Sequence, residues 1–460
     1  MLAYHMTMSR QAAKYLQDKR ILIVGLGQTG LSCARFLSDY EVDVAITDSR
    51  VEPPCLSALQ KELPDMAVFV GGFDELAFRR ADIILVSPGI SLREPLIAEA
   101  CARGAKIIGD IELFAWFVNV PVVAITGSNG KSTVTTLVGE MFHNAGIKAG
   151  VGGNIGKPAL DLLNEDNQVC VLELSSFQLE TTESLDPVAA ALLNISEDHL
   201  DRYDTLADYT AAKARIFYGS GVLVVNADDE KVMATARLFS VGRKQISFSL
   251  GIPEGDNYGI CQQDAGRWLC RGQQMLINVE DLKITGEHNL ANAMAALALG
   301  EAVGLTPEVM TDALRNFTGL PHRCQWVGQY NGVTWINDSK ATNVGAAIAA
   351  IEGIPGEKLV LIMGGQGKAQ DFSVLRNVVA RRARGVVLIG EDAPALRNAL
   401  DGVVPVASVG TMQEAVNKAA QTAQTNDTVL LSPACASFDM FKGFEDRGDT
   451  FVECVRSLYQ

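Results

Sequence analysis

The sequence lacks the cysteine pattern of a disulfide framework or a zinc ribbon. Its nine cysteines are odd in number and scattered, and none forms a Cys-x-x-Cys pair. Such usage fits a reducing compartment. Basic residues are also scarce, 39 against 54 acidic residues, for a net charge of −15. This balance argues against non-specific binding to nucleic acid or to an anionic membrane surface, although a local cradle for a small anion is compatible with it.

Long apolar runs are absent as well. No apolar stretch is long enough to span a bilayer, and the first residues show no apolar core followed by a cleavage site. We therefore expect a cytoplasmic protein that needs neither a membrane nor a nucleic acid. Aromatic residues make up 7% and charged residues 20%, while hydrophobic residues reach 48%, which indicates a folded chain. A length of 460 residues favours two to four domains.

Short apolar runs rich in β-branched residues recur along the chain, separated by helix-like stretches. This alternation predicts parallel sheets covered by helices on both faces. Polar or glycine residues follow each run, where ligands bind in open parallel sheets. The runs cover 21–24, 83–86, 122–125, 169–172, 222–225, 359–363, 386–389 and 429–431.

Three modules are expected, at 1–109, 110–319 and 320–460. The first and the second each begin with a glycine loop, and the third begins near Leu320-Pro321. A turn-rich stretch at 251–279 in the second module predicts a small β excursion. The predicted fold class is α/β, with three domains that are each a mainly parallel sheet with flanking helices.

A phosphate-binding loop is the most informative motif. An apolar strand at 122–125 runs into Thr-Gly-Ser-Asn-Gly-Lys-Ser-Thr, and a helix follows. Gly127 and Gly130 let backbone N–H groups point at phosphate oxygens, Lys131 can reach the terminal phosphates, and the Ser132 hydroxyl can bind Mg²⁺. The strict pattern places a glycine where this chain has Ile125. The alternative is an ordinary strand–turn–helix.

A second glycine loop, Gly-Leu-Gly-Gln-Thr-Gly at 25–30, follows the first strand, and Asp48 lies 18 positions after its last glycine. The pattern resembles a dinucleotide fingerprint and predicts a nucleotide diphosphate on a helix N-terminus. A structural tight turn and a nicotinamide-binding dehydrogenase or redox sensor are the alternatives.

Acidic and basic candidates follow other strands of the second module. Glu173 ends an apolar run and is well placed for Mg²⁺, or else is a surface or capping carboxylate. His199 lies in an acidic loop, as a ligand or as the start of a helix. Lys213 lies on an expected helix, where a solvated lysine is the default interpretation.

Two asparagines and a group of charged residues complete the candidates. Asn289 and Asn292 share a helix face and suit an adenine edge, with a helix N-cap at Asn289 as the alternative. In the third module, Arg323, an Asp338–Lys340 pair and a Gly-Lys loop ending at Lys368 follow strands or turns. Together they favour a pocket for anions.

These motifs resemble those of the Mur ligases. The resemblance rests on the phosphate loop and on further strings, and it covers nearly the whole chain after about residue 18. Those strings are Gly-Gly-Asn-Ile-Gly (152–156), Leu-Glu-Leu-Ser-Ser-Phe-Gln-Leu-Glu (172–180), Asp-His-Leu-Asp-Arg (198–202), His-Asn-x-x-Asn (288–292), Leu-Pro-His-Arg (320–323), Asn-Asp-Ser-Lys-Ala-Thr-Asn (337–343) and Leu-Ser-Pro-Ala-Cys-Ala-Ser-Phe-Asp (431–439). Within the family the chain is most similar to members that add D-glutamate, although Gln366 stands where many of them have Asp.

The resemblance implies a Rossmann-like N-terminal domain for the uridine nucleotide, a P-loop ATPase central domain and a Rossmann-like C-terminal domain for the amino acid. It places the uridine nucleotide near Gln28, Thr29, Asp48, Ser49, Arg50 and Gly89. It places ATP at Gly127, Ser128, Asn129, Gly130, Lys131, Ser132, Thr133, Asn154, Asn289, Asn292, Arg323 and Asp338. It places D-glutamate at Lys340, Thr342, Lys368, Ser437, Phe438 and Phe444.

The resemblance also implies two Mg²⁺ ions, bound by Ser132, Glu173, His199 and Lys213, with Lys213 carbamylated by CO₂ so that it offers oxygen ligands. Lys131, Glu173, His199 and Lys213 are the expected catalytic residues. The implied reaction is ATP-dependent addition of D-glutamate to UDP-N-acetylmuramoyl-L-alanine through an acyl phosphate, in peptidoglycan precursor synthesis, by a monomer. Another Mur-type amino-acid ligase is the nearer alternative.

Overall fold

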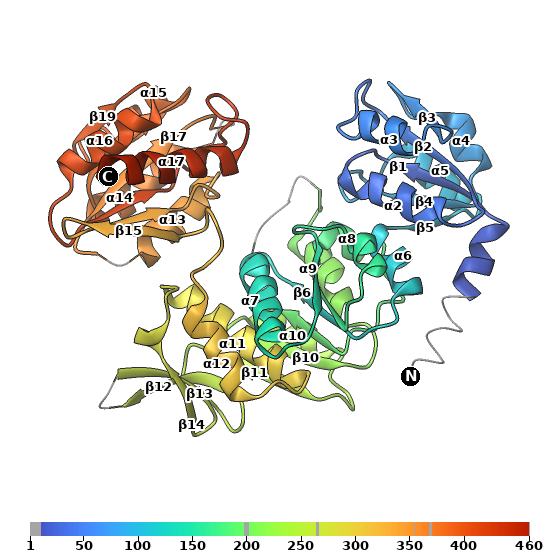
Figure 1. Ribbon diagram of the computed structural model, residues 1–460, viewed down its shortest axis with the longest axis horizontal. Coiled ribbons are helices and arrows are strands. Elements are labelled where there is room, and N and C mark those ends of the chain that lie inside the picture. Colours follow the sequence, from blue (N-terminus) through green and yellow to red (C-terminus); the bar gives the residue numbers. More distant parts are fainter. Residues whose placement is uncertain (1–10, 197–201, 264–265, 355, 368–369, 460) are drawn as a thin grey trace. The chain divides into compact units, whose positions relative to one another are not determined.

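The computed structural model describes residues 11–196, 202–263, 266–354, 356–367 and 370–459. These residues form three separate sheets, each flanked by helices (Figure 1), and the predicted α/β fold class is confirmed. The chain divides into two compact units, residues 1–280 with 291–314, and residues 281–290 with 315–460. Among the described residues, no helix is both long enough and apolar enough to cross a membrane.

The N-terminal sheet is parallel throughout its described strands, in the order β3-β2-β1-β4-β5. The crossing point between β1 and β4 brings the loops after these two strands together, which is where ligands bind in such sheets. The strands are β1 (Arg20–Val24), β2 (Asp43–Asp48), β3 (Ala67–Val70), β4 (Ile83–Val86) and β5 (Lys106–Ile108). The helices that connect them are α2 (Gln28–Ser38), α3 (Leu56–Glu62), α4 (Glu75–Arg80) and α5 (Pro95–Ala102), and α6 (Asp110–Phe117) leads to the next sheet.

The central sheet has the order β14-β13-β12-β11-β10-β9-β6-β8-β7. Its strands are β6 (Val122–Thr126), β7 (Ala149–Gly153), β8 (Val169–Glu173), β9 (Ala189–Leu192), β10 (Val222–Asn226), β11 (Gln245–Phe248), β12 (Tyr258–Gln263), β13 (Gly266–Arg271) and β14 (Gln274–Asn278). Its helices are α7 (Lys131–Asn144), α8 (Ser176–Glu180), α9 (Leu206–Ala214), α10 (Glu230–Arg237), α11 (Glu287–Ala302) and α12 (Pro307–Asn316). The antiparallel strands β12 to β14 are the predicted β excursion.

The third sheet has the order β15-β16-β20-β17-β18-β19, with β15 antiparallel to β16 and the other pairs parallel. Its strands are β15 (Gln325–Tyr330), β16 (Val333–Asn337), β17 (Leu359–Gly364), β18 (Ala383–Ile389), β19 (Val406–Ser408) and β20 (Thr428–Leu431). Its helices are α13 (Val344–Gly353), α14 (Arg376–Arg382), α15 (Ala393–Ala399), α16 (Met412–Thr422) and α17 (Phe444–Tyr459). Apolar residues of the central strands β17 and β20 are buried on both faces, as their continuous apolar sequence predicts.

Candidate functional site

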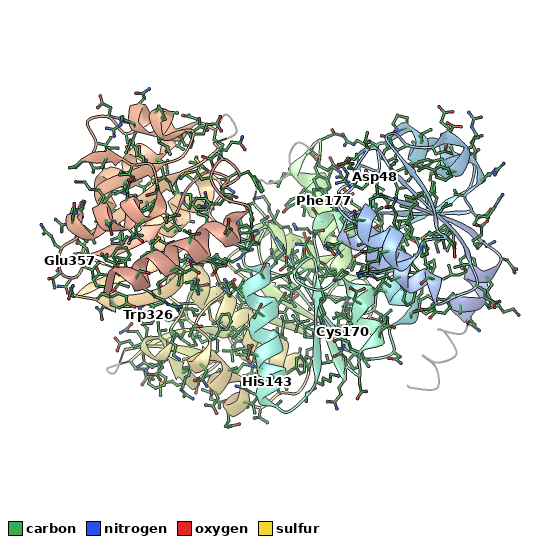
Figure 2. All side chains as sticks on the ribbon, turned by 45° about the horizontal axis from the view of Figure 1, so that its top comes forward. Asp48, His143, Cys170, Phe177, Trp326 and Glu357 are labelled. Atoms are coloured by element: carbon green, nitrogen blue, oxygen red, sulfur yellow. The ribbon has the colours of Figure 1, made fainter. Side chains whose placement is uncertain are left out.

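The phosphate loop joins the end of β6 to the start of α7. Gly130 precedes the helix with a φ of +83°, and a Cβ at this position would lie 2.3 Å from Oδ1 of Asn292. A side chain is therefore excluded there by both the backbone conformation and the space. Ser132 is buried in the first turn of α7, while Figure 2 labels His143 near the other end of that helix.

The predicted catalytic Lys131 lies against its own loop. Its Nζ donates hydrogen bonds to the carbonyl oxygens of Gly127 and Ser128, each at 2.9 Å. The loop is also bound to the segment that follows β9, because Asn129 N–H donates to Oδ1 of Asn194 at 2.8 Å and Asn194 Nδ2 donates to the Asn129 carbonyl at 3.0 Å. The ammonium group is thus held at the mouth of the phosphate cradle.

Lys213, expected by default to be solvated, is buried with 2% of its surface exposed, so that interpretation is wrong. Its Nζ donates to the Gly127 carbonyl at 3.0 Å and lies 4.6 Å from the ring centroid of Tyr209. The Tyr209 hydroxyl lies 3.2 Å from Oγ of Ser128. Helix α9 therefore presents two residues to the phosphate loop, and Tyr209 is one that the sequence analysis missed.

Glu173 is buried at the end of β8, so the surface-carboxylate and capping alternatives are wrong. It pairs with Ile125 of β6 and with Gly153 of β7. Gly153 has a φ of +99°, and a Cβ on it would lie 2.4 Å from the Glu173 carbonyl oxygen. This close approach brings Asn154 into reach, and its Nδ2 donates to Oε1 of Glu173 at 2.7 Å.

The second carboxylate oxygen of Glu173, Oε2, is buried and has no hydrogen-bond partner among the residues that the structure describes. A buried carboxylate oxygen without a donor is costly unless a cation or water satisfies it. Glu173 and the hydroxyl of Ser132 offer the oxygen ligands that Mg²⁺ prefers, so this chain's residues fit the ion. The described residues contain no group of three or more His, Cys, Asp and Glu side chains able to hold a metal. The predicted ligand His199 lies outside the described residues.

At the N-terminal sheet, Asp48, labelled in Figure 2, ends β2 and is buried. Its Oδ2 accepts from Leu26 N–H at 2.7 Å and from Nη2 of Arg50 at 2.6 Å, and its Oδ1 accepts from Nε of Arg50 at 2.9 Å. Burial acts to raise the pKa of Asp48, but these hydrogen bonds outweigh it and lower the pKa to about 2. Asp48 thus stays ionised and holds Arg50, which is half exposed.

The other predicted uridine contacts lie in the segments that follow β1, β2 and β4. Gln28 and Thr29 begin α2, while Ser49 and Gly89 are exposed after β2 and β4. The glycine loop itself is tightly packed, because a Cβ on Gly30 would lie 2.0 Å from the Gly25 carbonyl oxygen. The loop therefore has the close backbone packing that the glycine pattern predicts.

The two predicted adenine contacts both lie on α11. The helix begins at Glu287, two residues before Asn289, so the N-cap alternative for Asn289 is wrong. Asn289 Nδ2 donates to the Thr285 carbonyl at 2.9 Å. The side chain of Asn292 lies over Gly130 of the phosphate loop.

In the third sheet, Asp338 follows β16 and is buried. It accepts from Oγ of Ser432 at 3.0 Å and from Cys324 N–H at 3.1 Å. Burial raises the pKa of Asp338 to about 7, and these hydrogen bonds oppose that change only in part. Arg323 is exposed in the turn before β15.

Two of the predicted amino-acid contacts, Lys340 and Phe444, meet at the start of α17. The Lys340 ammonium lies 3.8 Å from the ring centroid of Phe444, the first residue of that helix. Ser437 is buried, Thr342 is half-buried and Phe438 is 67% exposed. Lys368 lies outside the described residues.

Arg447 is a further buried residue that the sequence analysis missed. Its guanidinium donates to the carbonyl oxygens of Ser339 and Cys435 at 2.8 and 3.1 Å and to Oγ of Ser339 at 2.9 Å. Burial lowers the pKa of Arg447 to about 10. The available signal was its position on the buried face of α17, in line with Phe451 and Val455.

Three family models match the chain in sequence order. Residues 19–109 match the model described as Mur ligase MurD-like, N-terminal domain. Residues 125–300 match the Mur ligase middle domain, and residues 322–435 match the Mur ligase, glutamate ligase domain.

Curated relatives agree along almost the whole length. The UDP-N-acetylmuramoylalanine–D-glutamate ligase of Nitrosococcus oceani is 53% identical over 439 residues, covering 95% of this chain and 96% of its own. The enzyme of the same name from Pseudomonas aeruginosa is 50% identical over 440 residues, covering 95% and 98%. Among solved structures, the UDP-N-acetylmuramate-alanine ligase of Thermotoga maritima matches 96% of this chain and all of its own, 100%, with a TM-score of 0.59 and 19% identity. That likeness supports the fold alone.

Proposed function

The chain belongs to the Mur ligase family, and on that basis we propose that it joins D-glutamate to UDP-N-acetylmuramoyl-L-alanine at the expense of ATP. The observation that carries the choice of amino acid is the identity of about half of all residues, over 95% of the chain, with relatives named for D-glutamate. The enzyme class, an ATP-dependent ligase that forms an amide bond in peptidoglycan synthesis, follows from the same matches.

The chemistry needs activation of a carboxylate. A free carboxylate does not accept an amine because oxide is too poor a leaving group, so ATP first phosphorylates the L-alanyl carboxylate. The D-glutamate amine then attacks the acyl phosphate, and the tetrahedral intermediate collapses to the amide and phosphate. Both organic reactants are anions, so the site must offset negative charge and exclude water from the acyl phosphate.

The residues around the phosphate loop suit that task. In our proposal Lys131 and the loop N–H groups, with Ser128, Asn129 and Thr133, hold the triphosphate, and Asn154 orients Glu173 through its 2.7 Å hydrogen bond. Ser132, Glu173 and His199 would hold Mg²⁺, which lowers the charge repulsion between phosphate and carboxylate. Mur ligases require both ATP and Mg²⁺; the presence of two ions rather than one is part of the proposal.

We further propose that Lys213 is carbamylated. As an ammonium group it is a donor and cannot bind a cation, whereas the carbamate formed with CO₂ has oxygen ligands. Support comes from its burial and from its position next to the Gly127 carbonyl.

The remaining assignments follow the same scheme. Arg50, held by Asp48, would contact the uracil end of the nucleotide sugar, and Asn289, Asn292, Arg323 and Asp338 would contact ATP. Lys340, with Thr342, Lys368, Ser437, Phe438 and Phe444, would hold D-glutamate. We also propose three domains at 1–109, 110–319 and 320–460, each built on one sheet, and a cytoplasmic monomer that binds neither membrane nor nucleic acid.

A phosphate-release assay with UDP-N-acetylmuramoyl-L-alanine, ATP, Mg²⁺ and a panel of amino acids tests the proposal. Release that depends on both the nucleotide sugar and D-glutamate is the expected result. Release with L-lysine or diaminopimelate instead would favour another Mur-type specificity. Binding of NAD(H) with no response to ATP would favour the dehydrogenase alternative.

A further inference from the structure

Asn337 connects three segments of the third sheet and is completely buried, with 0% of its surface exposed. It ends β16. Its Nδ2 lies 3.1 Å from Nδ1 of His322, in the turn before β15, and 3.1 Å from the carbonyl oxygen of Gly448 in α17. It also lies 3.2 Å from Oε1 of Gln325. The side-chain oxygen accepts from Ser339 N–H at 3.1 Å.

The orientation of this amide is fixed by its backbone partners. Ser339 N–H can only donate and the Gly448 carbonyl can only accept, so the nitrogen must face Gly448. The Gln325 side chain is fixed as well, because its Oε1 accepts from His322 N–H at 3.1 Å. The nitrogen of Asn337 has two hydrogens for three neighbours, the Gly448 carbonyl, Oε1 of Gln325 and Nδ1 of His322, and it cannot accept a hydrogen from the ring. A hydrogen on Nδ1 would therefore point at a group that only donates. In the neutral ring, Nδ1 is then the acceptor and Nε2 carries the hydrogen.

Helix α17 packs against the same nitrogen of the imidazole. A Cβ built on Gly448 would lie 2.2 Å from Nδ1 of His322. The ring thus occupies the space that a side chain at position 448 would need. The Asn337 amide and the surface of α17 thus both contact the Nδ1 side of His322 and restrict the ring.

The backbone that carries this ring is strained. His322 has a φ of +61° and Cys324 a φ of +46°, so Arg323 stands between two left-handed residues. Non-glycine residues adopt this conformation rarely, and it persists where surrounding contacts determine it. The contacts of Asn337 and Gly448 with the His322 ring are contacts of this kind.

The strained turn is also tied to the residues that follow β16. Lys340 N–H donates to the His322 carbonyl at 2.9 Å, and Cys324 N–H donates to Oδ1 of Asp338 at 3.1 Å. Any rotation of the turn would move Arg323 and would disturb Asp338 and Lys340. These are the side chains assigned above to ATP and to D-glutamate.

We propose that Asn337 is a positioning residue that acts through His322 to set the directions of Arg323 and Lys340, and so links the nucleotide and amino-acid contacts of the third sheet. The proposal rests on the function proposed above. It assigns to Asn337 no contact with either substrate.

Kinetics of Asn337→Ala give the first test. We expect the KM values for ATP and D-glutamate to rise about tenfold, because a small displacement of binding groups has a large effect. The KM for the uridine nucleotide should not change, since its proposed contacts lie in residues 1–109.

Asp427→Asn is the matched control. It neutralises a buried carboxylate of the same sheet, bonded to Nη2 of Arg384 at 3.0 Å, at the opposite end of the strands. We expect it to lower the thermal midpoint while leaving all KM values unchanged. Unchanged KM values in Asn337→Ala, or equal increases in both variants, would overturn the inference. Wild-type activity with D-glutamate, measured in the same assay, tests the proposed function separately.

Two further variants keep the inference testable if Asn337→Ala folds poorly. Gly448→Ala pushes on the same ring from α17 and should reproduce the two raised KM values. Asn337→Asp replaces the donor with a carboxylate, which accepts the hydrogen of the ring and should move it to Nδ1.

Imidazole ¹⁵N spectra read that tautomer without any need for activity, with His322→Gln identifying the signal among the five histidines. We expect a hydrogen on Nε2 in the wild type and on Nδ1 in Asn337→Asp. A hydrogen on Nδ1 in the wild type would overturn the inference whether or not the enzyme turns over.

Discussion

Lys131 and Lys213 donate hydrogen bonds to the same atom, the carbonyl oxygen of Gly127, at 2.9 and 3.0 Å. Their two ammonium nitrogens therefore lie within about 6 Å of each other, a range in which like charges disfavour one another. The arrangement concentrates positive charge where a triphosphate is expected. The repulsion between the two ammonium groups disappears if Lys213 becomes an uncharged amine and then a carbamate. The first prediction follows from this.

Lys213→Ala is expected to lower the ligase rate by about 10²–10³-fold, the usual loss when a charge-stabilising group is removed from a site. A small carboxylate such as acetate should restore part of the rate in the variant, because it can supply the missing oxygen ligands. Phosphate release with and without acetate measures both effects.

Lys213→Arg, which keeps a positive charge but cannot form a carbamate, should be inactive and not respond to acetate. Full activity in Lys213→Ala, or absence of rescue, would contradict the assigned role.

Glu173→Gln separates activity from stability. The amide oxygen can still accept from Asn154 Nδ2, now 2.7 Å from Oε1, but the group at the position of the unpartnered Oε2 becomes an NH₂ that cannot bind a cation. We expect a rate loss of about 10²-fold and a higher Mg²⁺ requirement. Without Mg²⁺ the thermal midpoint should not fall, since a buried unpaired charge has been removed. A Mg²⁺ titration of phosphate release and a melting curve test these two claims; a lower midpoint with normal Mg²⁺ dependence would assign Glu173 a structural role instead.

The fold class and much of the candidate site could be predicted from sequence because they depend on local patterns. Continuous apolar strands predict buried parallel sheets, and the residues that follow them, such as Glu173 and Asp48, lie at the strand ends as expected. The glycines at 127 and 130 likewise predict the phosphate loop, because the loop depends on a local pattern.

Burial of charged helix residues could not be predicted in this way. Lys213 looks like an ordinary solvated residue within its own helix, and only the packing of distant segments buries it. The contact of Asn337 with Gly448 joins positions 111 residues apart. No local pattern encodes such a contact, although His322 next to Arg323 drew attention to the turn.

The buried carboxyl of Asp110 predicts a pH dependence of stability. Burial raises its pKa to about 6. Gln178 Nε2 donates to Oδ2 at 3.0 Å, and Oδ1 has no hydrogen-bond partner within the described part of the chain. The pKa of Asp110 in the folded state lies above its unfolded value near 4, so the folded state binds a proton more tightly. The stability that this proton confers is present below about pH 4 and is lost as the pH rises to about 6. This difference between the folded and unfolded pKa values corresponds to roughly 3 kcal/mol of folding stability.

Asp110→Asn removes this titration. We therefore expect the thermal midpoint of the variant, relative to the wild type, to increase between pH 4 and pH 7 and then to level off. Melting curves at a series of pH values measure the difference. A constant difference across that range would show that Asp110 is not the responsible group.

Arg50→Lys tests the N-terminal contact against an internal control. Arg50 binds Asp48 through Nε at 2.9 Å and Nη2 at 2.6 Å, and Arg20 binds Asp82 through the same two groups, each at 2.9 Å. The two pairs lie at opposite ends of the strands of one sheet, and only the Arg50 pair lies at the carboxyl ends, where ligands bind. A lysine keeps the charge but loses the planar fork of the guanidinium group.

We expect Arg50→Lys to raise the KM for the uridine nucleotide about tenfold and to leave the KM values for ATP and D-glutamate unchanged. Arg20→Lys should change none of the three KM values. Equal responses of the two variants would mean that the Asp48–Arg50 pair stabilises the sheet and does not select the nucleotide.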